Sequence, residues 1–454
     1  MPISYCISPS LKDDEMNQEI PSTKSTDTWS RSTQPRKVPW KACGPKGLLL
    51  FVLSGFALVG GMILSSIHFF PAAATLAGPP AETATPGRPL APKPHPTSPR
   101  DSSARIAVGP YVQNMGTERA TVCWASREGE SRISGPDEVR TVPRYAVHEL
   151  LLGNLKPATR YHYDVLSDGS KAGQGSFTTF PSGQTPFHFV VVGDTRTNHK
   201  TYQAIVDQII TEKPLLVVNT GDLVSDGLDI RKWVEFFRIS SRLMRSIPYY
   251  PVLGNHEDNA AYYFNFFSLP QNERYYSFSV GDALFLILDE EGAYHETPAY
   301  MDEQARKVWW KQQNLQYMQR QKVWVERMLA LNESAGYTFV FLHEPLISVM
   351  HSRVEDARRW RAFWGGLFEK HHVSVVFSGH DHFYHHAVVQ GTQYITTAGG
   401  GAGLYNPDTP APETVLIKRV NHYCRVDVGP KQAQVTAIEL GGAIIEKVPL
   451  RRRH

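Results

Sequence analysis

Five short blocks in the second half of this 454-residue chain place metal-binding side chains directly after apolar runs. The blocks are Gly193-Asp194-Thr195-Arg196, Gly221-Asp222-Leu223, Gly254-Asn255-His256-Glu257, His343-Glu344-Pro345 and Gly379-His380-Asp381-His382. Together they supply two carboxylates, one amide and three imidazoles, which are ligands that divalent transition metals accept. Such a group suits a pair of metal ions and predicts hydrolysis of a phosphate ester.

The segments that must position these side chains are strand-like. Apolar runs lie at residues 187–192, 215–220, 249–253, 337–342 and 373–378, each directly before one of the blocks. Ligand sites in open α/β sheets form at the carboxyl ends of strands. We therefore expect the five strands to deliver their polar residues to one edge of a sheet. One Gly-Asp pair or one His is weak evidence, whereas five such blocks in order are strong evidence.

The region from residue 186 to residue 449 predicts an α/β domain. Further strand-like runs at 282–288, 393–397 and 434–439 alternate with helix-like segments at 200–211 and 229–245. This mixture is typical of sheet layers covered by helices. A polar, aromatic-rich insertion at 290–322 is either a lid or substrate wall beside the site, or an exposed helix that continues to residue 331.

Residues 104–181 have a different character, with short alternating runs separated by Gly, Pro and Asn. We expect Trp124 in the core between two sheets. Residues 155–163 resemble the tyrosine corner of fibronectin-type sandwiches, in which a Tyr hydroxyl bonds back to the backbone. The segment therefore predicts an all-β, fibronectin III-like domain. Its role is structural, since it contains no cluster of metal ligands.

The first hundred residues predict a membrane attachment. Residues 1–46 are polar and irregular, which is typical of a disordered tail. Residues 47–70 contain an uncharged apolar run preceded by basic residues, which predicts a transmembrane signal anchor with a cytoplasmic N-terminus. The alternative is a signal sequence cut near residues 72–77. The Pro- and Ala-rich residues 71–103 predict a linker, so we expect the catalytic part to be extracytoplasmic, either periplasmic or extracellular.

The composition of the chain limits which partners and cysteine-based sites the sequence indicates. A net charge of +3 gives no argument for a nucleic-acid partner. The four cysteines, Cys6, Cys43, Cys123 and Cys424, form no CxxC pair, so neither a thiolate zinc site nor a redox motif is indicated. Two alternatives stay open for Cys123 and Cys424: a disulfide outside the cytoplasm, or two unpaired buried thiols.

The five blocks in this order resemble the calcineurin-like metallophosphoesterases, whose pattern is Asp-x-His, Gly-Asp, Gly-Asn-His-Glu, His and Gly-His-x-His. With the preceding sandwich, residues 104–449 look like a purple acid phosphatase. The resemblance implies an α/β (α+β) fold with a four-layer αββα catalytic domain. It also implies a binuclear centre of divalent or trivalent ions, Fe, Zn or Mn, whose metal-bound hydroxide attacks phosphoester substrates.

The resemblance assigns each block a role. Asp222 would bridge the two metals, because a carboxylate can offer one oxygen to each ion. His256 would lie over the phosphate and protonate the leaving oxygen or stabilise the transition state. The remaining implied ligands are Asn255, His343 and His380 for one metal, and Asp194 and His382 for the other.

The first block departs from the family pattern. Arg196 replaces the expected His, and Ser225 replaces the Tyr that purple acid phosphatases carry three residues after the bridging Asp. The first metal thus loses one ligand under either template, and no purple colour is expected. Arg196 has no lone pair for a metal but can clamp a phosphate oxygen. His199 or Asn198 would be replacement ligands, and His351 is a further candidate for substrate contact.

Two alternatives to a phosphomonoesterase stay open. The first is a phosphodiesterase of the same fold, which these motifs do not separate from a monoesterase. The second is an extracytoplasmic binding protein whose metal site has decayed. Arg196 is the best support for decay, and retention of the other ligand-type residues opposes it.

Overall fold

A computed structural model describes residues 106–134, 139–167, 170–292 and 303–453 of the chain. All described residues belong to one compact unit. The predicted tail (1–46), anchor (47–70) and linker (71–103) therefore lie outside the described residues. Within the described part, no helix has the length and apolar character needed to cross a membrane.

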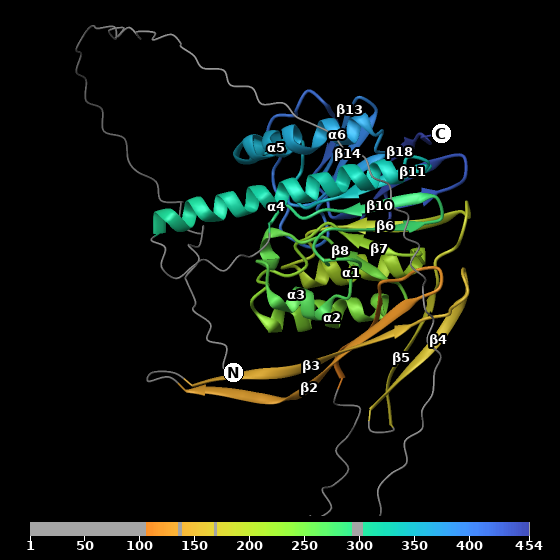
Figure 1. Cartoon of the computed structure of the whole chain (residues 1–454), viewed down its shortest axis with the longest axis vertical. Coiled ribbons are helices and arrows are strands. Elements are labelled where there is room, and N and C mark those ends of the chain that lie inside the picture. Colours follow the sequence, from red (N-terminus) through yellow and green to blue (C-terminus); the bar gives the residue numbers. More distant parts are fainter. Residues whose placement is uncertain (1–105, 135–138, 168–169, 293–302, 454) are drawn as a thin grey trace, which may run out of the picture. The chain divides into compact units, whose positions relative to one another are not determined.

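Two mixed sheets form the body of the catalytic part (Figure 1). The six-stranded sheet has the order β18-β17-β16-β6-β7-β8 and the seven-stranded sheet has the order β15-β13-β14-β12-β11-β10-β9. The strands of the six-stranded sheet are β6 (Phe187–Val192), β7 (Val217–Asn219), β8 (Tyr249–Pro251), β16 (His422–Val428), β17 (Ala433–Glu439) and β18 (Ile444–Leu450). Those of the seven-stranded sheet are β9 (Tyr276–Val280), β10 (Ala283–Ile287), β11 (Tyr337–Phe341), β12 (Val375–Ser378), β13 (Tyr384–Val389), β14 (Thr392–Thr397) and β15 (Thr414–Lys418).

The strands that precede the five blocks are parallel within each sheet. β6 pairs with β7 and β7 with β8, while β11 pairs with β12, all in parallel register. All five predicted strands are thus confirmed, but the prediction that they share one sheet edge was wrong. Three belong to the six-stranded sheet and two to the seven-stranded sheet, so the blocks meet where the carboxyl ends of two sheets lie together.

The two sheets face one another through an aromatic core. The ring of Phe189 on β6 lies 5.0 Å from the rings of both Phe285 on β10 and Phe339 on β11. Neighbouring residues of these strands point the other way, because side chains alternate along a strand. Leu284 and Val340 accordingly join a second cluster, which includes Val325 and Leu329 of α4 (Glu303–Leu331).

Helices cover the outer faces of both sheets and complete four layers (Figure 1). On the six-stranded side these are α1 (His199–Glu212), α2 (Ile230–Met244) and α3 (Ala261–Phe266). On the seven-stranded side they are α4, α5 (Val354–Trp360), the π-helix η4 (Arg361–Gly365) and α6 (Gly366–Lys370). Two 3-10 turns, η2 (Asn255–Glu257) and η3 (His351–Arg353), lie in loops. Most of the predicted insertion is the start of α4, which confirms the helix alternative for residues 303–322; residues 293–302 are not described.

The N-terminal part contains five strands in its described residues. β1 (Ile106–Gln113), β2 (Ala120–Ser134) and β3 (Val139–Leu152) form one sheet, and β4 (Arg160–Ser167) pairs with β5 (Ser170–Thr178). The predicted tyrosine corner is present, because the Tyr161 hydroxyl accepts a hydrogen bond from the Lys156 backbone N–H at 2.8 Å. The β content is confirmed, and the arrangement as a fibronectin-like sandwich stays a prediction.

Two expectations concern single residues of this region. Trp124 packs against the core but is only partly buried, and it stacks on its cross-strand partner His148 of β3 at 5.0 Å. Its place between two sheets stays a prediction, like the sandwich. Cys123 and Cys424 are buried free thiols, as the second alternative for them states.

Candidate metal centre

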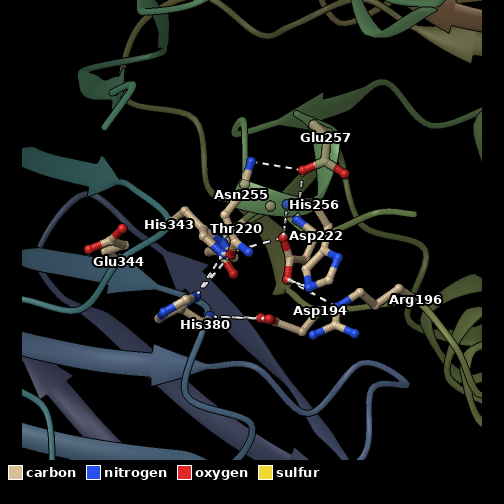
Figure 2. A network of polar contacts seen from close by, with 12 residues as sticks. Asp194, Arg196, Thr220, Asp222, Asn255, His256, Glu257, His343, Glu344 and His380 are labelled. Carbon is tan, nitrogen blue, oxygen red and sulfur yellow. Dashed lines mark hydrogen bonds and ion pairs between the residues drawn. The ribbon is translucent and has the colours of Figure 1, made fainter. Parts of the chain in front are cut away.

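Four side chains converge on one pocket at the carboxyl ends of the two sheets (Figure 2). His343 Nε2 lies 3.4 Å from Asp222 Oδ1 and 3.1 Å from Asn255 Oδ1. His380 Nδ1 lies 3.2 Å from both Asn255 Oδ1 and His343 Nε2. Two oxygens and two imidazole nitrogens therefore point at a common centre, and this mixed donor set suits Zn, Fe or Mn.

The loops that carry these ligands adopt strained backbone conformations. Asp194, Asp222 and His380 have φ values of 57°, 56° and 67°, in the left-handed region that costs non-glycine residues roughly 1–2 kcal/mol each. Gly254 allows a close approach, because a Cβ there would lie 2.5 Å from Asp222 Oδ1. Strain of this kind gathers at functional sites, where the surrounding structure holds it in place.

Glu257 joins two of these loops. Its buried carboxylate accepts backbone N–H bonds from Asp222 at 2.9 Å, Leu223 at 2.8 Å and Gly254 at 2.7 Å. Burial and the Asp222 charge raise the pKa of Glu257 to about 8, and the N–H donors oppose this rise by stabilising the ionised form. Glu257 thereby fixes the Asp222 loop against the Asn255 loop.

Backbone carbonyls orient the imidazoles. His343 Nδ1 donates to the carbonyl of Thr220 at 2.8 Å, and His382 Nδ1 donates to the carbonyl of Gly403 at 2.7 Å. Each bond leaves Nε2 of the ring facing the site, which is how metal-binding histidines are commonly held. His382 also stacks on Tyr405 with a centroid distance of 3.9 Å.

The pocket has an excess of negative charge. Burial lowers the pKa of His343, but Asp222, Asp194 and Glu291 outweigh it and raise that pKa to about 9. Burial would raise the pKa of Asp222, but His343, His256 and Arg196 hold it below its ordinary value. Burial and neighbouring positive charges lower the pKa of His380 to about 2, so its ring is neutral and keeps a lone pair. Buried carboxylates beside neutral imidazole nitrogen favour a cation, so the residues fit a bound metal.

Asp194 and His382 lie on the other side of Asp222, together with Arg196. His382 Nε2 lies 3.3 Å from Asp194 Oδ1. The guanidinium of Arg196 donates from Nε to Asp222 Oδ2 at 3.1 Å and lies 3.4 Å from His382 Nε2 through Nη2. Ligand atoms of Asp194, Asp222 and His343 all lie within 4.8 Å of one another.

His256 lies at the open side of this group. Its Nδ1 donates to the carbonyl of Ser225 at 3.0 Å, and its Nε2 is 3.9 Å from Asp222 Oδ2. The side chain is 31% exposed, whereas Asp222 is 1% exposed. The arrangement leaves Nε2 as the ring atom that a substrate can reach beside the pocket.

Three other residues named from the sequence do not join the ligands. Asn198 caps α1 by accepting the N–H of Thr201, and His199 bonds Glu235 on α2 at 3.2 Å. The start of α1 and its contact with α2 use both side chains, and their role as replacement ligands stays a prediction. His351 is exposed on η3.

Some positioning contacts have no signal in the sequence. Asp381, which lies between two histidines in the last block, binds Ser348 and Arg353 at 2.6 and 2.7 Å. Arg353 also donates to the backbone carbonyl of His380 at 2.6 Å. Glu257 was visible in the Gly-Asn-His-Glu block, but nothing local indicates that its carboxylate reaches the Asp222 loop. Glu344 binds Trp360 and lies apart from the pocket (Figure 2).

Comparisons with known proteins agree with this fold and site. Residues 187–384 match the family model of the calcineurin-like phosphoesterases. Purple acid phosphatase 21 of Arabidopsis thaliana is 27% identical over 278 residues, covering 56% of this chain and 58% of that protein. An uncharacterized protein of Mycobacterium tuberculosis is 25% identical over 319 residues, covering 62% and 56%.

Among solved structures, purple acid phosphatase PPD1 from yellow lupin seeds aligns with a TM-score of 0.59. It is 16% identical, and the alignment covers 77% of this chain and 74% of that one. The chain spans about half the length of the curated relatives it matches. Residues 187–384 are thus similar to the calcineurin-like phosphoesterases. Together with the preceding β region, the chain is similar to purple acid phosphatases.

Proposed function

We propose that this chain is a metal-dependent hydrolase of phosphate esters. The observation that carries the proposal is the convergence of Asp222, Asn255, His343 and His380 on one pocket, with His256 at its open side. A divalent ion bound there would lower the pKa of a coordinated water and neutralise phosphoryl oxygens. Fe, Zn and Mn all suit these donors.

The residues of the chain then have distinct tasks. The buried Asp222 and His343 would hold the cation on the side of the site that is closed to bulk water. His256 presents Nε2 to the substrate because Nδ1 is bound to Ser225, so Nε2 is the atom that delivers a proton to the leaving oxygen. Ordered loops around Glu257 keep these groups in place before substrate arrives.

Two further parts of the proposal rest on the sequence. The catalytic part would be extracytoplasmic and tethered through residues 47–70, and protease protection of intact cells would test that placement. A decayed binding protein is the rival reading. The convergence of four donors on one centre favours a working metal site over decay.

A direct test is hydrolysis by the purified full-length chain. We would assay phosphomonoesters and phosphodiesters with Mn²⁺, Zn²⁺ and Fe²⁺ in turn, beside the His343→Ala variant. Metal-dependent turnover that His343→Ala abolishes is the expected result. Absence of turnover with every ester and every metal would reject the proposal. The ratio of the monoester to the diester rate would separate the two substrate classes.

A further inference from the structure

One side chain stands where a second metal ion would be expected. Arg196 follows β6 by four residues, and its guanidinium faces Asp222 and Asp194 (Figure 2). Nε binds Asp222 Oδ2 at 3.1 Å, and Nη2 lies 3.4 Å from His382 Nε2. The side chain is only 15% exposed. A largely buried arginine thus contacts both a carboxylate oxygen and an imidazole nitrogen that could otherwise bind a metal.

The contact with Arg196 occupies the ring nitrogen of His382 that a metal would use. Nδ1 of His382 donates to the Gly403 carbonyl, so Nε2 is the ring nitrogen left to face Arg196 and Asp194. A guanidinium can only donate hydrogen bonds, and its Nη2 lies 3.4 Å from that nitrogen. A metal at this place would need the same imidazole nitrogen and the same Asp222 oxygen. Guanidinium and metal cannot both use them.

The remaining residues do not complete a metal site on this side. Asp194 accepts the His380 backbone N–H with both oxygens, at 3.2 and 3.0 Å, and His256 Nε2 lies 3.9 Å from Asp222 Oδ2 at the open side. Position 196 holds an arginine, whose guanidinium has no lone pair for a metal, and position 225 holds a serine. The backbone carbonyl of Ser225 is already bound to His256.

The guanidinium supplies part of what a metal would supply. It is a fixed positive charge against a carboxylate that is 1% exposed, and it contributes to the lowered pKa of Asp222. Arginine is suited to this place because it stays charged when buried and its planar fork holds two acceptors at once. It cannot act as a Lewis acid or activate water.

We propose that this chain holds one tightly bound metal ion, in the Asp222, Asn255, His343 and His380 pocket, and that the Arg196 guanidinium is a built-in cation in place of the second. The proposal rests on the function proposed above and lowers the expected number of ions from two to one. It also makes Arg196 a positioning residue for Asp222 and His382. Replacing it by His should open the second site.

The test is metal stoichiometry in the purified full-length protein. Metal-free protein is titrated with Mn²⁺, and bound Mn is counted by mass spectrometry and observed by electron paramagnetic resonance. We expect one Mn per chain with the spectrum of an isolated ion. In Arg196→His we expect two Mn per chain and a spin-coupled spectrum. Arg361→His is the matched control, since Arg361 pairs with Glu369 away from the site and should leave the count at one.

The outcomes separate this proposal from the proposed function. Two spin-coupled ions in the unaltered protein would overturn the single-ion proposal while leaving the function intact. A folded Arg196→His variant that still binds one ion would also overturn it. One bound ion without hydrolysis of any phosphoester would reject the function alone. If Arg196→His fails to fold, the count in the unaltered protein still decides the question.

Discussion

The two sides of Asp222 are built from similar parts and differ in how their charge is neutralised. On one side, Oδ1 faces His343, and Asn255 and His380 complete a four-donor pocket. On the other side, Oδ2 binds the guanidinium of Arg196. The first side is a set of oxygen and imidazole donors that suits a cation from solution. The second side carries its own cation.

This difference shows how one carboxylate can serve two environments. The same strained loop presents both oxygens of Asp222, and the same buried Glu257 holds that loop. The two sides differ in the residues that face each oxygen of Asp222. Replacing Arg196 by a metal-binding residue such as His should therefore alter the number of exchangeable cations without changing the scaffold that holds the ligands.

The largest effect should come from the four-donor side. His343→Ala removes an Nε2 donor at the centre of the pocket, so bound metal should be lost and kcat/KM should fall about 10⁴-fold, as expected when several kcal/mol of metal stabilisation disappear. Metal analysis and steady-state kinetics measure both. His351→Ala, at an exposed position, should leave them unchanged. Normal turnover by His343→Ala would refute a role for this side in catalysis.

His256→Ala should cause the next largest loss of activity. Loss of a proton donor costs about 10²–10³-fold in kcat for esters with poor leaving groups. Activated aryl esters should lose much less, because their leaving oxygen needs no proton. The metal content should not change. His199→Ala is the control, since that ring pairs with Glu235. Equal losses for alkyl and activated esters would argue against proton donation.

Glu257→Gln should weaken the scaffold that both sides share. The amide group would turn an N–H donor toward backbone N–H groups that now bind an oxygen, and the free energy of unfolding should fall by about 1–3 kcal/mol. Urea unfolding of the metal-free protein measures it. Glu355→Gln, exposed on α5, serves as control. An unchanged midpoint would mean that Glu257 does not hold these loops together.

Arg196→Lys should have the smallest effect. Lysine keeps the charge but has no planar fork to hold Asp222 and His382 together, so we expect about a tenfold loss of kcat/KM with one bound ion retained. Activity equal to that of the unaltered protein would show that charge alone matters at this position. Uptake of a second ion by Arg196→Lys would show that the planar guanidinium, rather than positive charge alone, excludes the second ion from the unaltered protein.

Much of the fold could be predicted from the sequence because its strands are buried on both faces. Residues 187–192 are apolar except for His188, and β6 has those bounds. The pairing of strands into two sheets depends on contacts distant in sequence, such as Phe189 with Phe285 and Phe339, and no local pattern encodes them. Residues 303–331 form a single helix of 29 residues, which the scattered aromatic residues did not distinguish from a substrate wall.

The site, like the fold, could be predicted from the sequence only in part. The ligand types and their order were readable because each directly follows an apolar run. The reach of Glu257 to the Asp222 loop was not, nor was the contact of Arg196 with His382, which is 186 residues away in sequence. His199 and Asn198 were named as ligands because they are close to Asp194 in sequence, yet the start of α1 turns them elsewhere.

The most direct test of the single-ion proposal is a crystal structure of the Mn²⁺-loaded protein with anomalous diffraction data. The account predicts one anomalous peak, among Asp222, Asn255, His343 and His380, with the Arg196 guanidinium still bound to Asp222 Oδ2. Two peaks on either side of Asp222, with Arg196 turned away, would contradict it.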